Sequence, residues 1–226
     1  MASWTRLGDW WQAELAGDDS YEEIVTPLLL EVMRPEPGHT YLDLGCGDGR
    51  VMESVVAAGG IAIGLELVPE LASLAGRHGP VVVGRLPNLH SIKADSVDGA
   101  LMVLVVEHLK ETDALFAEVA RVVRTGGMFA LVINHPTWTA PESTPITDED
   151  GEVLWRPGGY FESGGSSEVR AGEHTVTFFH RTVADLLNAA ADAGWALEKV
   201  VERPHHELVD QVGIPRLMAC RWSLIP

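Results

Sequence analysis

The sequence contains only two cysteines among its 226 residues, Cys46 and Cys220. Two cysteines are too few for a disulfide framework and show no metal-ligand spacing, so we interpret both as small buried hydrophobic residues. No apolar run approaches the roughly 20 residues that span a bilayer, and the first residues lack the basic flank and apolar core of a secretion signal. The sequence therefore predicts a cytoplasmic protein without a membrane segment.

Basic residues are also scarce: 16 lysines and arginines stand against 33 aspartates and glutamates, and the formal net charge is −17. Such a surface repels phosphate backbones, so nucleic acid is not an expected partner. A content of 46% hydrophobic and 22% charged residues is ordinary for a globular chain of this length. This composition disfavours a disordered or fibrous protein.

Two amphipathic helices are predicted before the core, within residues 1–36. Apolar side chains that include Trp11 recur at helical spacing, and residues 20–23 resemble a capping box before the second helix. Pro27 predicts a kink or a restart of this helix. We favour plain packing for the aromatic side chains, and the alternative is that the two helices form a lid over a site.

From Thr40 onwards, short apolar runs alternate with helical patterns. Strands that alternate with helices pair in parallel through right-handed crossovers, which predicts a doubly wound α/β sheet covered on both faces. The predicted strands are 41–44, 61–65, 81–83, 99–105 and 128–133, and the predicted helices are 50–58, 69–77 and 112–124.

Residues 135–173 lose this periodicity and carry four prolines and two Gly-Gly pairs. So long a connection is usually a lid or substrate wall, or else disordered. We find no internal repeat and no second core, so residues 1–226 are interpreted as one domain. Regular patterns return as a strand at 175–180, a helix capped by Thr182 and Asp185 that stops at Gly194, and two last strands near 196–201 and 217–224.

Residues 41–50, Tyr-Leu-Asp-Leu-Gly-Cys-Gly-Asp-Gly-Arg, run from a strand through a glycine-rich turn into a helix. Glycine at positions 45, 47 and 49 lets the backbone approach a ligand closely in the crevice beyond the end of the strand. The spacing G-x-G-x-G is one residue short of the dinucleotide fingerprint, which weakens the interpretation of a pyrophosphate on the helix start.

Two acidic residues accompany this loop. Asp43 places a carboxylate where a phosphate-bearing cofactor would be repelled and a ligand with an ammonium or sulfonium group attracted. Glu66 follows the second strand 21 residues after Gly45, where a carboxylate can accept both hydroxyls of a ribose. The pair therefore argues against NAD, and a capping or solvated role is the alternative for each acid.

These motifs, taken in order with later ones, resemble the class I S-adenosylmethionine-dependent methyltransferases of the small-molecule branch. The resemblance covers about residues 40–201 and is carried by the segments 42–50, 64–66 (Gly-Leu-Glu), 96–98 (Ser-Val-Asp), 107–109 (Glu-His-Leu) and 118–127 (Glu-Val-Ala-Arg-Val-Val-Arg-Thr-Gly-Gly). It implies an enzyme that transfers a methyl group from S-adenosyl-L-methionine to an oxygen or nitrogen of a small-molecule acceptor. We expect no metal, because no convincing cluster of carboxylates and amides stands out.

The same resemblance implies a seven-stranded Rossmann-like sheet with N-terminal helices and an insertion after the fifth strand. Along the chain, the implied parts are an N-terminal helical lid at 1–36, a cofactor-binding core at 40–134, a substrate-side insertion at 135–173, and a C-terminal helix with two strands at 174–226.

The resemblance also assigns parts of the cofactor to residues of this chain. Asp43 and the loop backbone would hold the methionine part, Glu66 the ribose, and Leu67 the adenine slot. The family usually has an acidic residue after the third strand, where this chain has Gly-Arg-Leu at 84–86, so Arg85 is expected to give backbone or stacking contact instead. The implied cofactor-binding residues are Asp43, Gly45, Cys46, Gly47, Asp48, Gly49, Glu66, Leu67, Arg85, Leu86, Met102, Val103 and His108.

Three histidines are candidates for a general base, because an imidazole with a pKa near neutrality can take a proton from the acceptor. The resemblance puts His108 near the reacting centre, whereas His135 and His180 stand at the two ends of the insertion. A purely structural role is the alternative for each. The residues predicted to bind substrate are Trp11, Trp138, Tyr160 and Arg181, the last either as a clamp for an anionic substrate or as a partner of surface acids.

Two other functions fit parts of the sequence. A nicotinamide-dependent oxidoreductase is opposed by the glycine spacing and by Asp43. A catalytically inactive cofactor-binding partner or regulatory protein of the same fold is favoured only by Arg85, which stands where the family has an acid.

Overall fold

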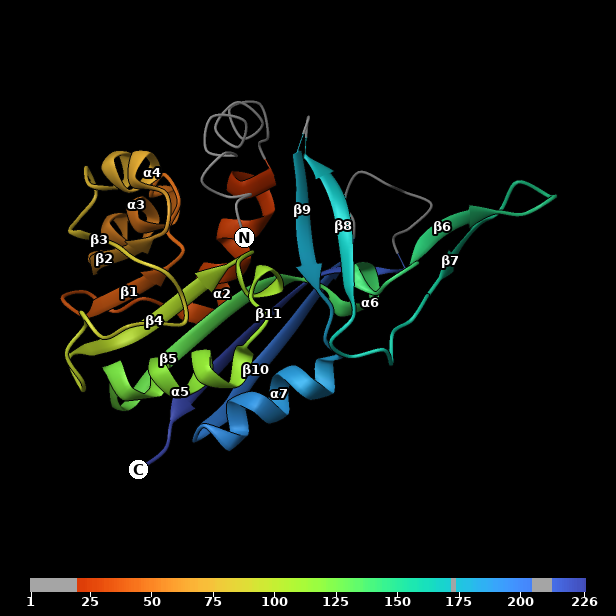
Figure 1. The fold of residues 1–226 in the computed structure, drawn as a ribbon. Helices are drawn as coiled ribbons and strands as arrows, with labels where there is room; N and C mark the ends of the chain where they lie inside the picture. Colours follow the sequence, from red (N-terminus) through yellow and green to blue (C-terminus); the bar gives the residue numbers. More distant parts are fainter. Residues whose placement is uncertain (1–19, 172–173, 205–212) are drawn as a thin grey trace.

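The computed structural model of the protein describes residues 20–171, 174–204 and 213–226 (Figure 1). The predicted first helix and Trp11 lie outside these residues. The chain builds the predicted α/β sheet of seven strands, in the order β10-β11-β5-β4-β1-β2-β3. Its strands are β1 (Thr40–Leu44), β2 (Ile61–Glu66), β3 (Val81–Val83), β4 (Val97–Val103), β5 (Val123–Asn134), β10 (Trp195–Pro204) and β11 (Pro215–Leu224).

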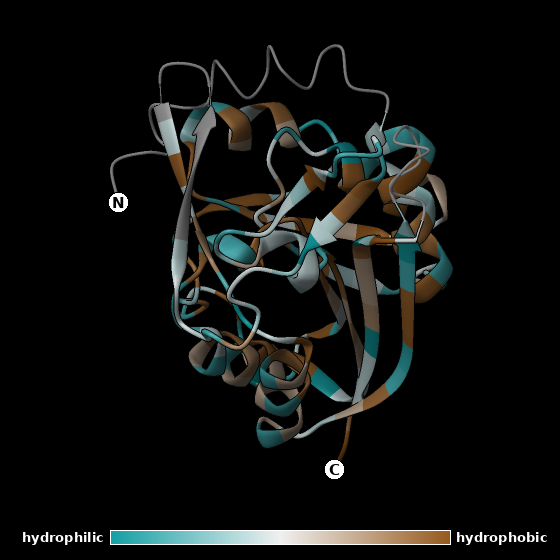
Figure 2. Cartoon of the chain, turned by 90° about the vertical axis from the view of Figure 1, so that its right-hand side faces the viewer, coloured by the Kyte–Doolittle hydropathy of each residue, from teal (hydrophilic) through white to brown (hydrophobic). Residues whose placement is uncertain are grey.

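Helices cover both faces of the sheet and bury an apolar core on each (Figure 1). One core packs Phe116, Trp195 and Trp222 around the Phe129 ring, under α5 and α7. Figure 2 shows hydrophilic and hydrophobic stretches alternating along the helices, as expected of helices that bury one side. The helices are α2 (Thr26–Met33), α3 (Arg50–Ala57) and α4 (Pro69–Ala75) on one face, and α5 (Thr112–Val122) and α7 (Val183–Asp192) on the other.

The carboxyl ends of β1, β2, β4 and β5 meet at one edge of the sheet, because these strands pair in parallel. The glycine-rich turn follows β1 at this edge, and a short 3-10 helix, η2 (Val106–His108), follows β4. The insertion begins where β5 ends. Segments distant in sequence are thereby gathered at the edge where α/β sheets bind their ligands.

Strand β11 differs in direction from the parallel strands of the core. It pairs antiparallel with both β5 and β10. Only residues 205–214 lie between β10 and β11, and a parallel crossover needs a dozen or more residues.

The boundary between α5 and β5 also differs from the prediction. We expected the helix to run to residue 124 and the strand to begin at 128, whereas α5 ends at Val122 and β5 begins at Val123. The β4–β5 register shifts between Val97, opposite Val123, and Gly99, opposite Met128. Gly126 and Gly127 therefore lie in an irregular stretch of β5, where Gly126 has a φ of +78°.

The capping box predicted at residues 20–23 is wrong. Ser20 has helical backbone angles, with φ −62° and ψ −30°, whereas an N-cap residue is extended. A π-helical turn, η1 (Tyr21–Val25), runs directly into α2, with Pro27 in the first turn of that helix. The segment is helical without a break from Tyr21 to Met33, so the helix does not restart at Pro27.

The insertion is more regular than predicted. It forms a short helix, α6 (Pro136–Thr139), and two separate hairpins, β6–β7 (Thr144–Thr147 and Val153–Arg156) and β8–β9 (Ser166–Ala171 and His174–Phe179). In Figure 1 the β6–β7 hairpin extends away from the body, whereas β8–β9 stands beside it. The helix after the insertion begins with the predicted capping box, in which Thr182 and Asp185 bond each other's backbone N–H groups.

Candidate functional site

The glycine-rich turn follows a path that side chains would obstruct. Gly45 has a φ of +80°, and a Cβ there would lie 2.7 Å from a methyl carbon of Val105. Its N–H donates to the carbonyl of Leu65 at 2.8 Å, which fastens the turn to β2. Gly49, with a φ of +90°, stands directly before α3. The turn therefore needs glycine both for its backbone angles and for the space around it.

Asp43 lies beneath this turn with 2% of its surface exposed. Its Oδ2 atom is buried and has no hydrogen-bond partner among the described residues. Burial raises the pKa of this carboxyl to about 8, and repulsion from Glu66 adds to the effect. A buried carboxyl that lacks a cation is held partly in its neutral form, and a cationic ligand would favour its ionised form.

Glu66 ends β2 and connects the turn to the next segment. Its Oε2 accepts the N–H of Gly47 at 2.9 Å, and its Oε1 accepts the N–H of Val68 at 2.8 Å. A carboxylate offers about four lone-pair sites, so each oxygen keeps capacity for one further donor. Glu66 can thus support the loop and accept two ligand hydroxyls at the same time.

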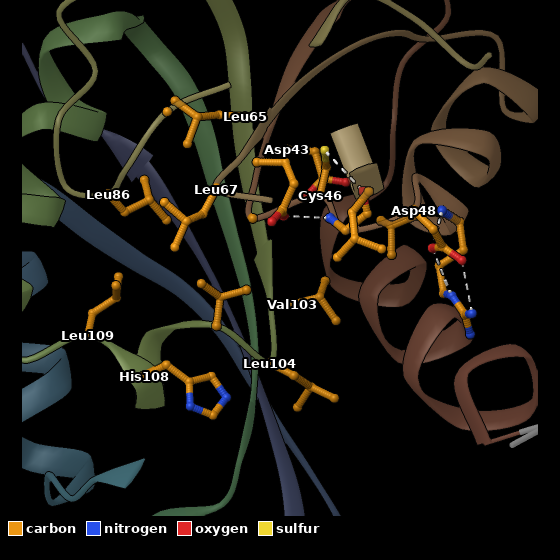
Figure 3. A pocket seen from close by; sticks show the side chains of 18 of the residues that line it. Asp43, Cys46, Asp48, Leu65, Leu67, Leu86, Val103, Leu104, His108 and Leu109 are labelled. Carbon is orange, nitrogen blue, oxygen red and sulfur yellow. Dashed lines mark hydrogen bonds and ion pairs between the residues drawn. The ribbon is translucent and has the colours of Figure 1, made fainter. Parts of the chain in front are cut away.

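A cavity of about 1060 Å³, counted to its open mouth, lies over these residues. Figure 3 shows Asp43 and Asp48 at one side of the cavity and Leu86 and His108 at the other. The predicted residues that line it are Asp43, Gly45, Cys46, Gly47, Asp48, Glu66, Leu67, Arg85, Leu86, Val103 and His108.

Two residues expected at the cofactor lie elsewhere: Gly49 is not part of the cavity wall, and Met102 is fully buried in the core under α5. The structure adds Tyr21 and Leu104, which sequence reasoning missed. Burial raises the pKa of Tyr21 well above its usual range, and the Arg50 guanidinium lies 4.9 Å from the centre of its ring. The apolar periodicity of this helical segment gave no signal for a cavity residue.

His108 is the predicted histidine whose ring lines the cavity (Figure 3). Its Nδ1 lies 3.2 Å from the carbonyl oxygen of Thr177 on β9, and its ring packs edge-on against Phe178. A carbonyl only accepts hydrogen bonds, so Nδ1 carries the proton and the neutral ring has its lone pair on Nε2. Burial lowers the pKa of His108, although nearby Glu107 opposes the effect. The ring is therefore neutral at pH 7.

His135 and His180 lie apart from the cavity wall. His135 begins α6: its Nδ1 accepts the N–H of Thr137 at 3.1 Å, and its Nε2 lies 2.8 Å from a carboxylate oxygen of Glu202. His180 is 1% exposed and donates through Nε2 to the carbonyl of Tyr160 at 2.8 Å. Both rings thus fasten the ends of the insertion to its surroundings.

Arg181 binds main chain. Its guanidinium donates to the carbonyls of Val106 and Phe179, both at 3.1 Å, and also to those of Leu109 and Lys110. These bonds join the base of β9 to the η2 turn that carries His108. The Arg181 side chain therefore holds two segments of the site together.

The two aromatic residues expected to bind substrate also lie outside the cavity wall. Tyr160 accepts the N–H of Val183 on its hydroxyl at 3.2 Å. Trp138 stacks on Trp155, with ring centres 4.4 Å apart. Within the described part of the chain, no three or more His, Cys, Asp or Glu side chains are grouped as metal ligands.

Across residues 20–171, 174–204 and 213–226, no helix is long and apolar enough to cross a membrane. The cytoplasmic location stays a prediction.

Comparisons with known proteins show what this chain is similar to. The family model for a methyltransferase domain matches residues 42–131. A ubiquinone biosynthesis O-methyltransferase of Xanthomonas axonopodis pv. citri is 30% identical over 137 residues, which cover 56% of each chain. An uncharacterized methyltransferase of Mycobacterium bovis is 31% identical over 134 residues, which cover 58% of this chain and 53% of that one. The chain thus spans about half the length of these curated relatives.

Among solved structures, an S-adenosylmethionine-dependent methyltransferase from Mesorhizobium loti shares the fold. Its TM-score is 0.78 at 24% sequence identity, and the match covers 92% of this chain and 99% of that chain.

Proposed function

We propose that the protein transfers a methyl group from S-adenosylmethionine to an oxygen or nitrogen of a small molecule. The match of residues 42–131 to the family model for a methyltransferase domain supports this proposal. The observation that carries this proposal is the buried Asp43 carboxylate, which faces the cavity without a partner among the described residues. The net charge of −17 supports a small molecule over a nucleic acid as acceptor.

The residues present fit this cofactor, which carries a positively charged sulfonium that makes its methyl group transferable. The Asp43 carboxylate would attract the cationic methionine part, beside the turn at Gly45 and Gly47. Glu66 would accept the ribose hydroxyls with the lone pairs that remain on its oxygens, and Leu67 and Leu86 would line the adenine slot.

The chain's part in the transfer is chiefly alignment and the exclusion of water. Positioning alone is worth effective concentrations of about 10⁵ M or more in well-oriented reactions. Leu104 and Val105 would give an apolar wall at the end of β4, and the β8–β9 hairpin would cover the site next to η2. Loss of positive charge during transfer is favoured in such an apolar setting.

We assign the general base to His108. Its ring lines the cavity, with Nδ1 fixed by the Thr177 carbonyl, and would take the proton that the acceptor loses. His135 and His180 are given structural roles in this proposal, because their ring contacts hold the insertion.

The proposal is tested by titrating S-adenosylhomocysteine into the protein by calorimetry, with Glu66→Ala as the informative variant. We expect micromolar binding in the parent and a dissociation constant on the order of 100-fold higher in Glu66→Ala, because hydrogen bonds to a charged group are each worth about 1.5–3 kcal/mol. The control is Glu70→Ala, an exposed acid in the first turn of α4. Absence of binding in the parent would refute the proposal.

Replacement of His108 by glutamine tests the base. A general base contributes typically 10²–10⁴-fold, so we expect kcat to fall by about that range while S-adenosylhomocysteine affinity changes little. Turnover is measured against a panel of alcohols, phenols, amines and a bulk tRNA, with the exposed His90→Gln as control. An unchanged kcat in His108→Gln would show that His108 is not the general base. Methylation of tRNA and of no small molecule in the panel would show that the acceptor is a nucleic acid.

A further inference from the structure

A polar cluster that the proposed mechanism does not use lies at the same edge of the sheet. It consists of Glu107, Asn134 and Arg216, and we call it the edge cluster. Glu107 belongs to η2, Asn134 ends β5, and Arg216 stands at the start of β11. The antiparallel pairing sets Leu217 opposite Asn134, and this register brings Arg216 to the end of β5.

Asn134 connects the two charged members of the edge cluster. Its amide nitrogen donates to Oε1 of Glu107 at 2.7 Å, and its amide oxygen accepts a hydrogen bond from Arg216. Glu107 is only 4% exposed, and its other oxygen, Oε2, is buried without a partner among the described residues. A buried acceptor without a donor costs about 1–3 kcal/mol. This oxygen therefore keeps unused capacity to accept a hydrogen bond.

Arg216 retains donors for an anion. Its contacts with described residues use Nη1 for Asn134 and the guanidinium face for the Trp138 ring, whose centre lies 4.8 Å away. The Nε and Nη2 edge is the side of a guanidinium that binds a planar anion through two parallel bonds. By contrast, Arg181 donates to main-chain carbonyls, and Arg50 forms an ion pair with Asp48.

The edge cluster is linked to the cavity wall through Glu107, although none of its three side chains is part of that wall. Glu107 is followed by His108, which forms part of the cavity wall. The Glu107 carboxylate also opposes the lowering of the His108 pKa and contributes to the raised pKa of Tyr21, so its charge acts on two residues of the wall. The electrostatic influence of Glu107 therefore extends to the cavity wall.

We propose that the edge cluster binds the methyl acceptor, and that the acceptor is a hydroxy- or amino-carboxylate. Arg216 binds its carboxylate, and before transfer Oε2 of Glu107 accepts a hydrogen bond from its hydroxyl or amino group. That hydrogen bond breaks as the oxygen or nitrogen takes the methyl group, and the proton passes to His108. The inference rests on the proposed function and specifies its substrate class. A dedicated cation is required for such an acceptor, because the net charge of −17 repels anions from the protein as a whole.

Calorimetry on the protein saturated with S-adenosylhomocysteine tests this assignment. The probes are mandelate and phenylglycine, compared with benzyl alcohol and benzylamine, which lack the carboxylate. We expect mandelate to bind at least tenfold more tightly than benzyl alcohol. Arg216→Lys keeps the positive charge but loses the planar guanidinium. It should therefore weaken the binding of mandelate at least tenfold and leave the binding of benzyl alcohol unchanged. Glu107→Gln should weaken phenylglycine more than mandelate, because it removes the charge that favours an ammonium group.

The control is Arg203→Lys, an exposed arginine on β10 that pairs with Glu31. A variant that keeps its affinity for S-adenosylhomocysteine is folded. If Arg216→Lys loses this affinity, Glu107→Gln provides the test instead. Equal binding of mandelate and benzyl alcohol, or no binding of any probe to a protein that binds S-adenosylhomocysteine, would overturn the acceptor class and leave the proposed function intact. Failure of S-adenosylhomocysteine to bind the parent would overturn both.

Discussion

Asparagine in place of Asp43 is expected to stabilise the free protein and to abolish cofactor binding. The carboxyl is 2% exposed, its Oδ2 atom has no partner among the described residues, and its pKa is raised to about 8, mainly by burial. Asparagine has a similar shape and no charge to bury. The same change removes the anion that would attract a cationic cofactor, so we expect S-adenosylhomocysteine binding at least 100-fold weaker.

The pH dependence of this gain follows from the direction of the shift. The unfolded carboxyl has a pKa near 3.9, so between about pH 4 and pH 8 the folded protein holds the proton more tightly than the unfolded chain does. The parent therefore loses stability as pH rises through this window, and Asp43→Asn does not suffer that loss. We expect the Tm advantage of the variant to be largest at pH 8 and above, and to shrink towards pH 5.

Thermal denaturation of the free proteins from pH 5 to pH 9 measures this difference. The matched control is Asp98→Asn, because Asp98 accepts the N–H of Thr40 at 2.8 Å and its pKa is lowered by Thr40 and Arg124 in spite of partial burial. That variant should lose stability at neutral pH. A Tm of Asp43→Asn below that of the parent at pH 8 would show that the carboxylate has a stabilising partner in the free protein.

The affinity of the parent protein for S-adenosylhomocysteine should also depend on the protonation of Asp43. Below pH 8 a cationic ligand has to displace the proton from Asp43, so affinity should rise with pH up to about 8, with net proton release on binding. Calorimetry in buffers of different ionisation enthalpy measures that release, and Asp43→Asn should remove it.

Local motifs were predictable from the sequence because their geometry is set within a few residues. The glycine turn after β1 and the capping box at Thr182 are of this kind, and so is the acid that ends β2. The edge cluster was not predictable, because Glu107, Asn134 and Arg216 meet only through the antiparallel register of β5 and β11. Sequence spacing contains no signal for a contact that depends on which strands become neighbours.

The histidines illustrate the same limit on the candidate site. Residue type alone makes His108, His135 and His180 equivalent bases, since all three have the same intrinsic pKa. Their surroundings distinguish them. The rings of His135 and His180 form hydrogen bonds that hold the insertion. The ring of His108 lines the cavity, because it belongs to the η2 turn, which Arg181 holds in place. That turn follows Leu104, whose φ of +54° redirects the chain at the end of β4 and was not foreseen for a leucine.

Alanine substitutions in the glycine turn should also have a large effect on stability. We expect Gly49→Ala to destabilise the protein much more than Gly47→Ala. At Gly49 the added Cβ would lie 2.7 Å from the Cα of Ala75, a fully buried residue of α4, at a φ of +90°. Left-handed backbone costs alanine about 1–2 kcal/mol and overpacking about 1–3 kcal/mol, so Gly49→Ala should lose about 2–5 kcal/mol of folding free energy. For a protein of this size that corresponds to a Tm lower by roughly 4–20 °C.

Gly47→Ala is the matched control for this loss. Its φ is +56°, and nothing lies within 4 Å of the added Cβ, so only the backbone cost of about 1–2 kcal/mol applies. Thermal denaturation of the two variants side by side should therefore separate backbone strain, which both share, from contact with α4, which only Gly49→Ala has. Equal Tm losses would mean that α4 moves aside at little cost, and that the packing of α4 against the turn does not fix its shape.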